Sequence, residues 1–103
     1  MFSNFDRAFM QEAIKLAKEA ELNGEVPVGA LITLDNKIIG RGFNQVISLN
    51  DVTAHAEIIA IRDASKTINN YRLKDACMYV TLEPCHMCAK ALVDARVSKL
   101  IFS

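Results

Sequence analysis

The spacing of apolar and polar residues predicts a helix near the start of the chain. Between Asn4 and about Leu22 one face is charged, and apolar residues recur every three or four positions on the other, at Phe5, Phe9, Ala13, Leu16, Ala17 and Ala20. Ser3 or Asn4 can cap such a helix at its N-terminus, and Asn23-Gly24 is typical of a helix end. We therefore expect one amphipathic helix that packs on a core.

The next segment has the pattern of a β-hairpin. Residues 28–34 and 37–43 are short runs rich in β-forming side chains, and Asp35-Asn36 separates them. Asn tolerates the positive φ that a tight two-residue turn requires. The pattern predicts two antiparallel strands.

The remainder of the chain alternates between helix and strand. A polar loop over 44–53 leads into a predicted helix at 54–65 with Thr53 as its N-cap, and a strand at 78–82, a helix at 85–94 and a strand at 99–102 follow. The predicted order is αββαβαβ. Strand–helix–strand units require parallel pairing with right-handed crossovers, so we expect a mixed sheet with an antiparallel hairpin at one edge. The fold class is a three-layer α/β domain.

Composition supports a single domain over residues 1–103. The chain is 51% hydrophobic and 23% charged, and no repeat, low-complexity stretch or linker divides it. Twelve basic residues balance twelve acidic ones, so the net charge is zero, and a nucleic-acid partner cannot be inferred from bulk electrostatics but would need a local basic surface. No apolar run approaches the roughly 20 residues that span a bilayer, and residues 1–6 lack the pattern of a signal peptide. With an odd number of cysteines, three, we expect free thiols and a cytoplasmic location.

Candidate metal ligands lie at the starts of the second and third predicted helices. Cys85 and Cys88 are three residues apart, so they share one helix face, and both lie at the positive end of the helix dipole, which favours a thiolate. His55, at the start of the other helix, can supply a third ligand. A Cys2His set leaves the fourth tetrahedral position of a zinc ion open to water.

An open coordination position is typical of catalytic zinc, which lowers the pKa of bound water from about 16 toward roughly 7. Glu57 is two residues beyond His55, so it lies near the metal and is free to face the water. A carboxylate there can accept the water's proton and pass it to a leaving nitrogen. The motifs therefore indicate a zinc-dependent hydrolase.

The zinc motifs, Thr53–Ile58 and Pro84–Cys88, belong to a longer resemblance that also includes Glu25–Ala30, Gly42–Asn44, Asn70–Leu73 and Tyr79–Cys85. Nearly end to end, the chain resembles the bacterial tRNA-specific adenosine deaminases of the zinc-dependent cytidine deaminase superfamily. The resemblance implies the three-layer cytidine-deaminase-like fold and hydrolysis of the wobble adenosine of a tRNA anticodon to inosine, with release of ammonia. It also implies a homodimer with one zinc ion per subunit.

The resemblance implies a role for each candidate residue. His55, Cys85 and Cys88 are expected to hold zinc, and Glu57 to shuttle the proton. Asn44 is expected to hydrogen-bond the purine, which suits an amide because it offers a donor and an acceptor. The remaining two, Val26 and the backbone at Ala54, are expected to line the base pocket.

Members of this family continue beyond the strand at 99–102 with a further strand and helices. We therefore expect an uncovered sheet edge here, and the residues are also compatible with a shortened, catalytically inactive deaminase-like chain. The cysteine and histidine motifs are compatible, in addition, with a thioredoxin-like dithiol, with a structural zinc module whose fourth ligand is a side chain, and with a deaminase acting on cytosine or guanine.

Nearby residues that resemble ligands have simpler interpretations. His86 lies between the cysteines, and a helix turns about 100° per residue, so its side chain is expected to face solvent. Cys77 is expected to be a small apolar packing residue, and Met78 and Met87 to be core residues. Five scattered cations are candidates for phosphate contacts, namely Arg72, Lys74, Lys90, Arg96 and Lys99.

Overall fold

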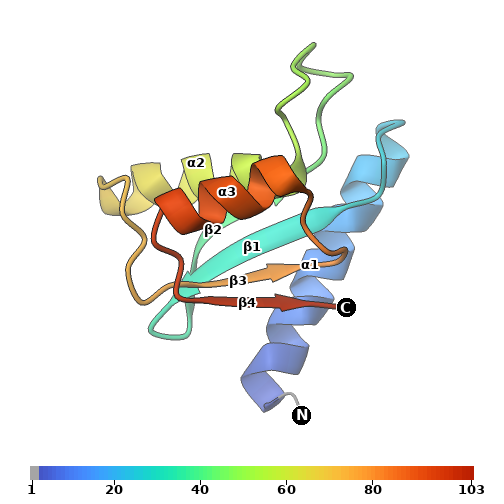
Figure 1. Cartoon of the computed structure of the whole chain (residues 1–103). Helices are drawn as coiled ribbons and strands as arrows, with labels where there is room; N and C mark the ends of the chain where they lie inside the picture. Colours follow the sequence, from blue (N-terminus) through green and yellow to red (C-terminus); the bar gives the residue numbers. More distant parts are fainter. Residues whose placement is uncertain (1–2) are drawn as a thin grey trace.

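A computed structural model describes residues 3–103 as seven elements. Their bounds are α1 Asn4–Leu22, β1 Gly29–Leu34, β2 Lys37–Phe43, α2 Ala56–Ile68, β3 Cys77–Val80, α3 His86–Asp94 and β4 Lys99–Phe102 (Figure 1). This order confirms the predicted αββαβαβ arrangement. Within the described residues, no helix has the length and apolar character needed to cross a membrane.

The four strands form one mixed sheet in the order β2-β1-β3-β4. The hairpin is confirmed, since β1 and β2 pair antiparallel and both turn residues, Asp35 (φ 51°) and Asn36 (φ 60°), have positive φ. β1 also pairs antiparallel with β3, whereas β3 and β4 pair in parallel. β2 and β3 therefore run in the same direction with β1 between them, so only the β3–α3–β4 unit joins neighbouring parallel strands.

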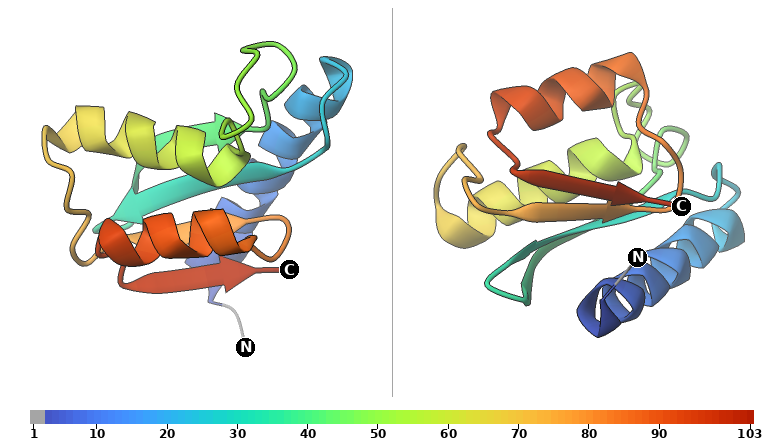
Figure 2. Two further views of the ribbon diagram at one scale, coloured as in Figure 1. Left: turned by 45° about the horizontal axis from the view of Figure 1, so that its top comes forward. Right: turned by 60° about the horizontal axis from the view of Figure 1, so that its bottom comes forward.

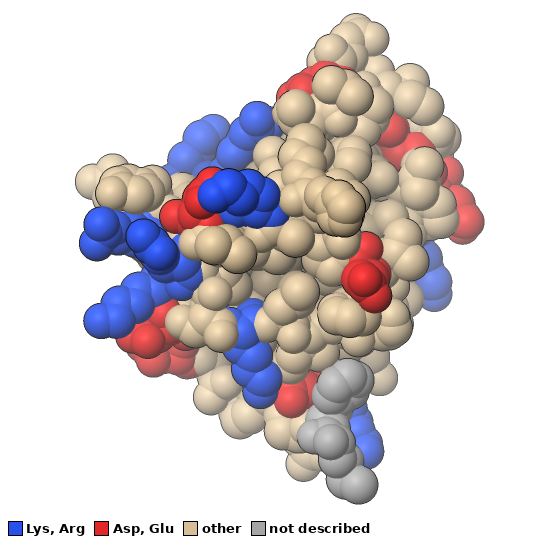
Figure 3. Space-filling model, viewed as in Figure 1, with Lys and Arg blue, Asp and Glu red and all other residues tan. Residues whose placement is uncertain are grey.

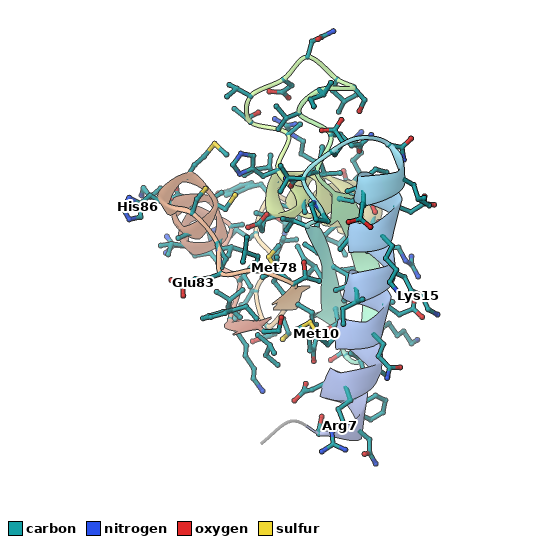
Figure 4. All side chains as sticks on the ribbon, turned by 90° about the vertical axis from the view of Figure 1, so that its right-hand side faces the viewer. Arg7, Met10, Lys15, Met78, Glu83 and His86 are labelled. Atoms are coloured by element: carbon teal, nitrogen blue, oxygen red, sulfur yellow. The ribbon has the colours of Figure 1, made fainter. Side chains whose placement is uncertain are left out.

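Helices cover both faces of the sheet, which confirms the three-layer fold. α1 packs on one face, and α2 and α3 pack on the other (Figure 2). β1 is buried along five of its six residues because it is central and both of its faces are covered. Met78 is fully buried on the side of α2 and α3, as expected (Figure 4).

Two glycines bring helix backbones into direct contact with the hairpin. A Cβ on Gly29 would lie 2.1 Å from the carbonyl oxygen of Ala13 in α1, and one on Gly42 would lie 2.4 Å from that of Ala56 in α2. Real Cβ atoms do not approach a carbonyl this closely, so any side chain would push the helix away. The contact at Gly42 sets the first turn of α2 against the end of β2.

The predicted cap of the second helix was wrong. α2 begins at Ala56, with His55 as N-cap, and the backbone N–H and Oγ1 of Thr53 both donate to Asp51 Oδ1, at 2.9 and 2.7 Å. The cap comes from elsewhere, because the Ala56 N–H donates to Asn44 Oδ1 at 2.7 Å. A residue at the end of β2 therefore orients the helix that carries the metal-ligand motif.

Other local predictions have mixed outcomes. Ser3 caps α1 as predicted, in a reciprocal pair with Asp6. The predicted apolar face of α1 is buried or packed on the core from Phe9 to Ala20, whereas Phe5 is 56% exposed and Met10, which was not predicted, is buried against the sheet (Figure 4). Met87 is 37% exposed, so its assignment to the core was wrong. The reason is that it lies on the solvent side of the first turn of α3.

Candidate metal centre and active site

The predicted metal ligands meet at one end of the sheet. The N-termini of α2 and α3 lie side by side there, as Figures 1 and 2 show. His55 Nδ1 lies 3.6 Å from Cys85 Sγ and 3.5 Å from Cys88 Sγ, and the three candidate ligand atoms lie within 4.8 Å of one another. His86 is exposed, and its side chain points outward from the start of α3 (Figure 4).

This geometry fits zinc. With a Zn–N distance of about 2.05 Å and a Zn–S distance of about 2.3 Å, tetrahedral angles place the nitrogen and each sulfur roughly 3.6 Å apart. The separations of 3.5 and 3.6 Å agree with that value. Within residues 3–103 the group contains three ligands, one fewer than a closed structural zinc site requires.

The two cysteines differ in environment. Cys88 is fully buried, and Cys85 is exposed at the N-cap of α3. Burial, followed by the negative charge of Glu57, raises the pKa of the Cys88 thiol far above its usual range. For Cys88 these effects oppose the helix dipole, which favours a thiolate. Metal binding at Cys88 must therefore displace a proton.

A cleft of about 150 Å³ opens beside the ligands. Its walls are formed by Val28, Asn44, His55, Glu57, Leu82, Glu83 and Cys85. Cavities that hold drug-sized molecules are about 300–1,000 Å³, so this one suits a group the size of a single heterocycle. Glu57 is only 4% exposed and lines the same cleft as two of the ligands, which places a carboxylate beside the metal position.

Of the three predicted substrate-binding residues, one lines this cleft. Asn44 is 8% exposed and lines the cleft. Its Oδ1 accepts a hydrogen bond from the Ala56 N–H, so its Nδ2 is the group that remains for a ligand. Ala54 is fully buried, and its backbone bonds to Gln45 and Asp51 within the loop. Val26 is 63% exposed and lies outside the lining of the cleft.

Three lining residues were missed by the sequence analysis, namely Val28, Leu82 and Glu83. Each lies inside a motif that the resemblance covers, two residues after Val26 or immediately before Pro84-Cys85. Their sequence positions were therefore available, but nothing in apolar periodicity distinguishes a cleft wall from a core position.

The chain belongs to the cytidine and deoxycytidylate deaminase family: the family model for the zinc-binding region matches residues 3–103. Among curated relatives, it is 54% identical over 102 residues to the tRNA-specific adenosine deaminase of Buchnera aphidicola subsp. Schizaphis graminum, covering 99% of this chain and 68% of that protein. It is 52% identical over 101 residues to the tRNA-specific adenosine deaminase of Haemophilus influenzae, covering 97% of this chain and 58% of that protein.

Solved structures share the fold closely. One, from a study of A-to-I editing by tRNA:A34 deaminases at the wobble position, has a TM-score of 0.91 at 47% identity, covering 93% of this chain and 74% of that one. The guanine deaminase of Bacillus subtilis has a TM-score of 0.92 at 39% identity, covering 99% of this chain and 64% of that one. The predicted cytidine-deaminase-like architecture is confirmed.

Proposed function

We propose that this chain carries out zinc-dependent hydrolytic deamination of the wobble adenosine of tRNA, converting adenosine and water to inosine and ammonia. The observation that carries the reaction class is the placement of His55 Nδ1 at 3.5–3.6 Å from two cysteine sulfurs, with Glu57 lining the adjoining cleft. The likeness to relatives named as tRNA-specific adenosine deaminases supports the substrate.

The chemistry of the donor set supports one zinc ion held by His55, Cys85 and Cys88. When bound, zinc activates a water molecule for attack at neutral pH. In our proposal the Glu57 carboxylate removes a proton from the attacking water and then delivers it to the departing amino group. The adenine ring is oriented by the Asn44 amide and held between the apolar side chains of Val28 and Leu82, which line the cleft.

Substrate access favours a single-stranded nucleotide. A cleft sized for one base admits a base only after it has left the stack, and a loop nucleotide does so at lower cost than a paired one. We propose that Ala54 contributes by fixing the loop before His55, and that Val26 contacts the RNA outside the base pocket.

A second candidate, deamination of free guanine, is compatible with the backbone of this chain. The TM-score to the guanine deaminase is 0.92, against 0.91 to the tRNA deaminase, so backbone shape does not separate the two substrates. Sequence identity does separate them, at 39% against 47%, and favours tRNA. A thioredoxin-like dithiol is disfavoured because an imidazole nitrogen lies next to both sulfurs.

The remaining proposals concern assembly and setting. We propose a homodimer, as the resemblance to the family implies. A cytoplasmic location would keep Cys85 and Cys88 reduced for metal binding. The chain spans 68% and 58% of the lengths of the two curated relatives, and a catalytically inactive deaminase-like chain is the competing hypothesis.

One experiment tests the proposed reaction, substrate and metal together. The purified 103-residue chain, loaded with zinc, is incubated with an adenosine anticodon stem-loop, with free guanine and with free cytidine, and inosine formation, ammonia release and metal content are measured. We expect inosine from the stem-loop and little ammonia from the free compounds. Stoichiometric zinc without any turnover would support the inactive chain, and turnover of guanine alone would support the second candidate.

A further inference from the structure

One buried carboxylate has no part in the proposed reaction. Glu25, between α1 and β1, is 6% exposed, and its two oxygens accept hydrogen bonds from successive backbone amides of the loop over residues 44–53. Oε1 lies 3.0 Å from the nitrogen of Ile47, and Oε2 lies 2.8 Å from that of Ser48. A carboxylate, with two acceptor oxygens, is suited to this pair of donors.

The loop over residues 44–53 has few other ties to the domain. Most of its hydrogen bonds are internal turns, such as Leu49 N–H to Gln45 O and Asp51 N–H to Val46 O. Among the described residues, the polar contacts of the middle of the loop with the domain are those with Glu25 and an Arg62–Asp51 ion pair at 3.6 Å, and Leu49 also lines a cavity with Arg41 and Ile59. The ion pair is partly exposed and contributes little to stability, so Glu25 is the main polar attachment.

This loop connects two parts of the site. It begins at Asn44, which lines the cleft, and leads through Ala54 to the metal ligand His55. Its ends are held independently, since the Asn44 N–H donates to Val28 O in the sheet connection and Asn44 Oδ1 caps α2. Releasing Glu25 would therefore move the middle of the loop and leave the metal ligands in place.

The middle of the loop presents apolar side chains to solvent. Ile47 is 66%, Leu49 50% and Val52 79% exposed. The loop projects from the domain at the top of Figure 1, and the same region of Figure 3 is mostly tan, with red acidic atoms beside it. Because the loop is continuous with the cleft wall at Asn44, these side chains are candidates for contact with a nucleotide adjacent to the one in the cleft.

We propose that Glu25 is a positioning residue that holds the 44–53 loop against the domain, so that its apolar tip packs on the nucleotides flanking the target base. The substrate in this inference rests on the proposed function, but the attachment of the loop by Glu25, which we call the clamp, does not. The carboxylate is suited to the task at neutral pH: burial opposes ionisation, yet the backbone amides of Ile47 and Ser48 and the Ser48 side chain together outweigh burial and lower the pKa of Glu25.

The first test measures the clamp without any substrate. Gln is nearly the same shape as Glu but offers one acceptor oxygen, so Glu25→Gln leaves one loop amide facing another donor. We expect hydrogen exchange at the Ile47 and Ser48 amides to accelerate about tenfold, with helix and strand amides unchanged. Glu21→Gln, at an exposed position on α1, is the matched control and should leave all rates unchanged. Unchanged exchange at both amides in Glu25→Gln would overturn the clamp.

The second test measures the consequence for substrate. With an anticodon stem-loop, Glu25→Gln should raise KM about fivefold to tenfold, while kcat and zinc content stay within about twofold of the parent. Val52→Asn changes only an exposed side chain and should raise KM in the same way. An unchanged KM in both variants, loss of zinc, or a fall in kcat alone would contradict the positioning role. If the parent chain makes no inosine, the proposed function fails, and the exchange experiment still decides whether Glu25 holds the loop.

Discussion

Replacing Asn44 separates a structural role from a substrate role in one residue. Its Oδ1 accepts the Ala56 N–H at 2.7 Å, and its Nδ2 is left for the cleft. Asn44→Ala removes both functions and leaves a buried N–H without a partner at the start of α2. Asn44→Asp keeps an acceptor oxygen at the helix N-terminus, where a carboxylate is favourable, but removes the amide donor.

The size of the effect follows from the lost bond. An unpaired buried donor costs about 1–3 kcal/mol, and each kcal/mol shifts the Tm of a domain of this size by roughly 4–8 °C. We therefore expect Asn44→Ala to unfold at least about 4 °C below the parent, and Asn44→Asp to remain much closer to it. Both variants should lose deamination by about tenfold or more, since one good hydrogen bond to the base is absent.

The assay is thermal unfolding of the zinc-loaded proteins, followed by circular dichroism, with inosine formation measured in parallel. If Asn44→Ala melts at the temperature of the parent, the capping argument is refuted. If Asn44→Asp retains full turnover, the amide does not contact the base.

Three further predictions concern the metal, the proton shuttle and the packing of α2. Glu57→Gln should keep stoichiometric zinc and lower kcat about 10²- to 10⁴-fold, and an undiminished rate of inosine formation would exclude Glu57 as the proton shuttle. Cys88→Ala should lose zinc and unfold more easily, as should the parent after chelation, and zinc analysis alongside melting curves measures both effects. Gly42→Ala should cost about 1–3 kcal/mol in urea unfolding, because its Cβ would lie 2.4 Å from the Ala56 carbonyl; unchanged stability would mean that α2 can shift freely.

The elements were predictable where local signals agree. The structure places α1 and the strands at 37–43 and 99–102 close to their predicted bounds. The turn lies at Asp35 and Asn36, as predicted, and both residues have positive φ. Prediction failed where a distant residue takes over a local role. Thr53 is a good cap by residue type, but it bonds to Asp51, and Asn44 caps α2 instead.

The candidate site shows the same division. Spacing identified Cys85 and Cys88 as partners, and the combination of their motif with His55 and Glu57 indicated zinc chemistry; the structure brings all four to one place. The walls of the cleft were less predictable. Val28 and Leu82 are apolar residues near strand ends, and their sequence does not say whether a core or a cleft lies beside them.

The sequence by itself determined the order of the elements, the hairpin turn and the ligand types, because these depend on residues only a few positions apart. Only the tertiary structure decided that a strand-end amide caps the ligand-bearing helix, that Cys88 is buried beside a carboxylate, and that Glu25 holds a loop more than 20 residues further along. Those features depend on which surfaces meet when the helices close over the sheet, and contacts between residues far apart in the chain have no local pattern.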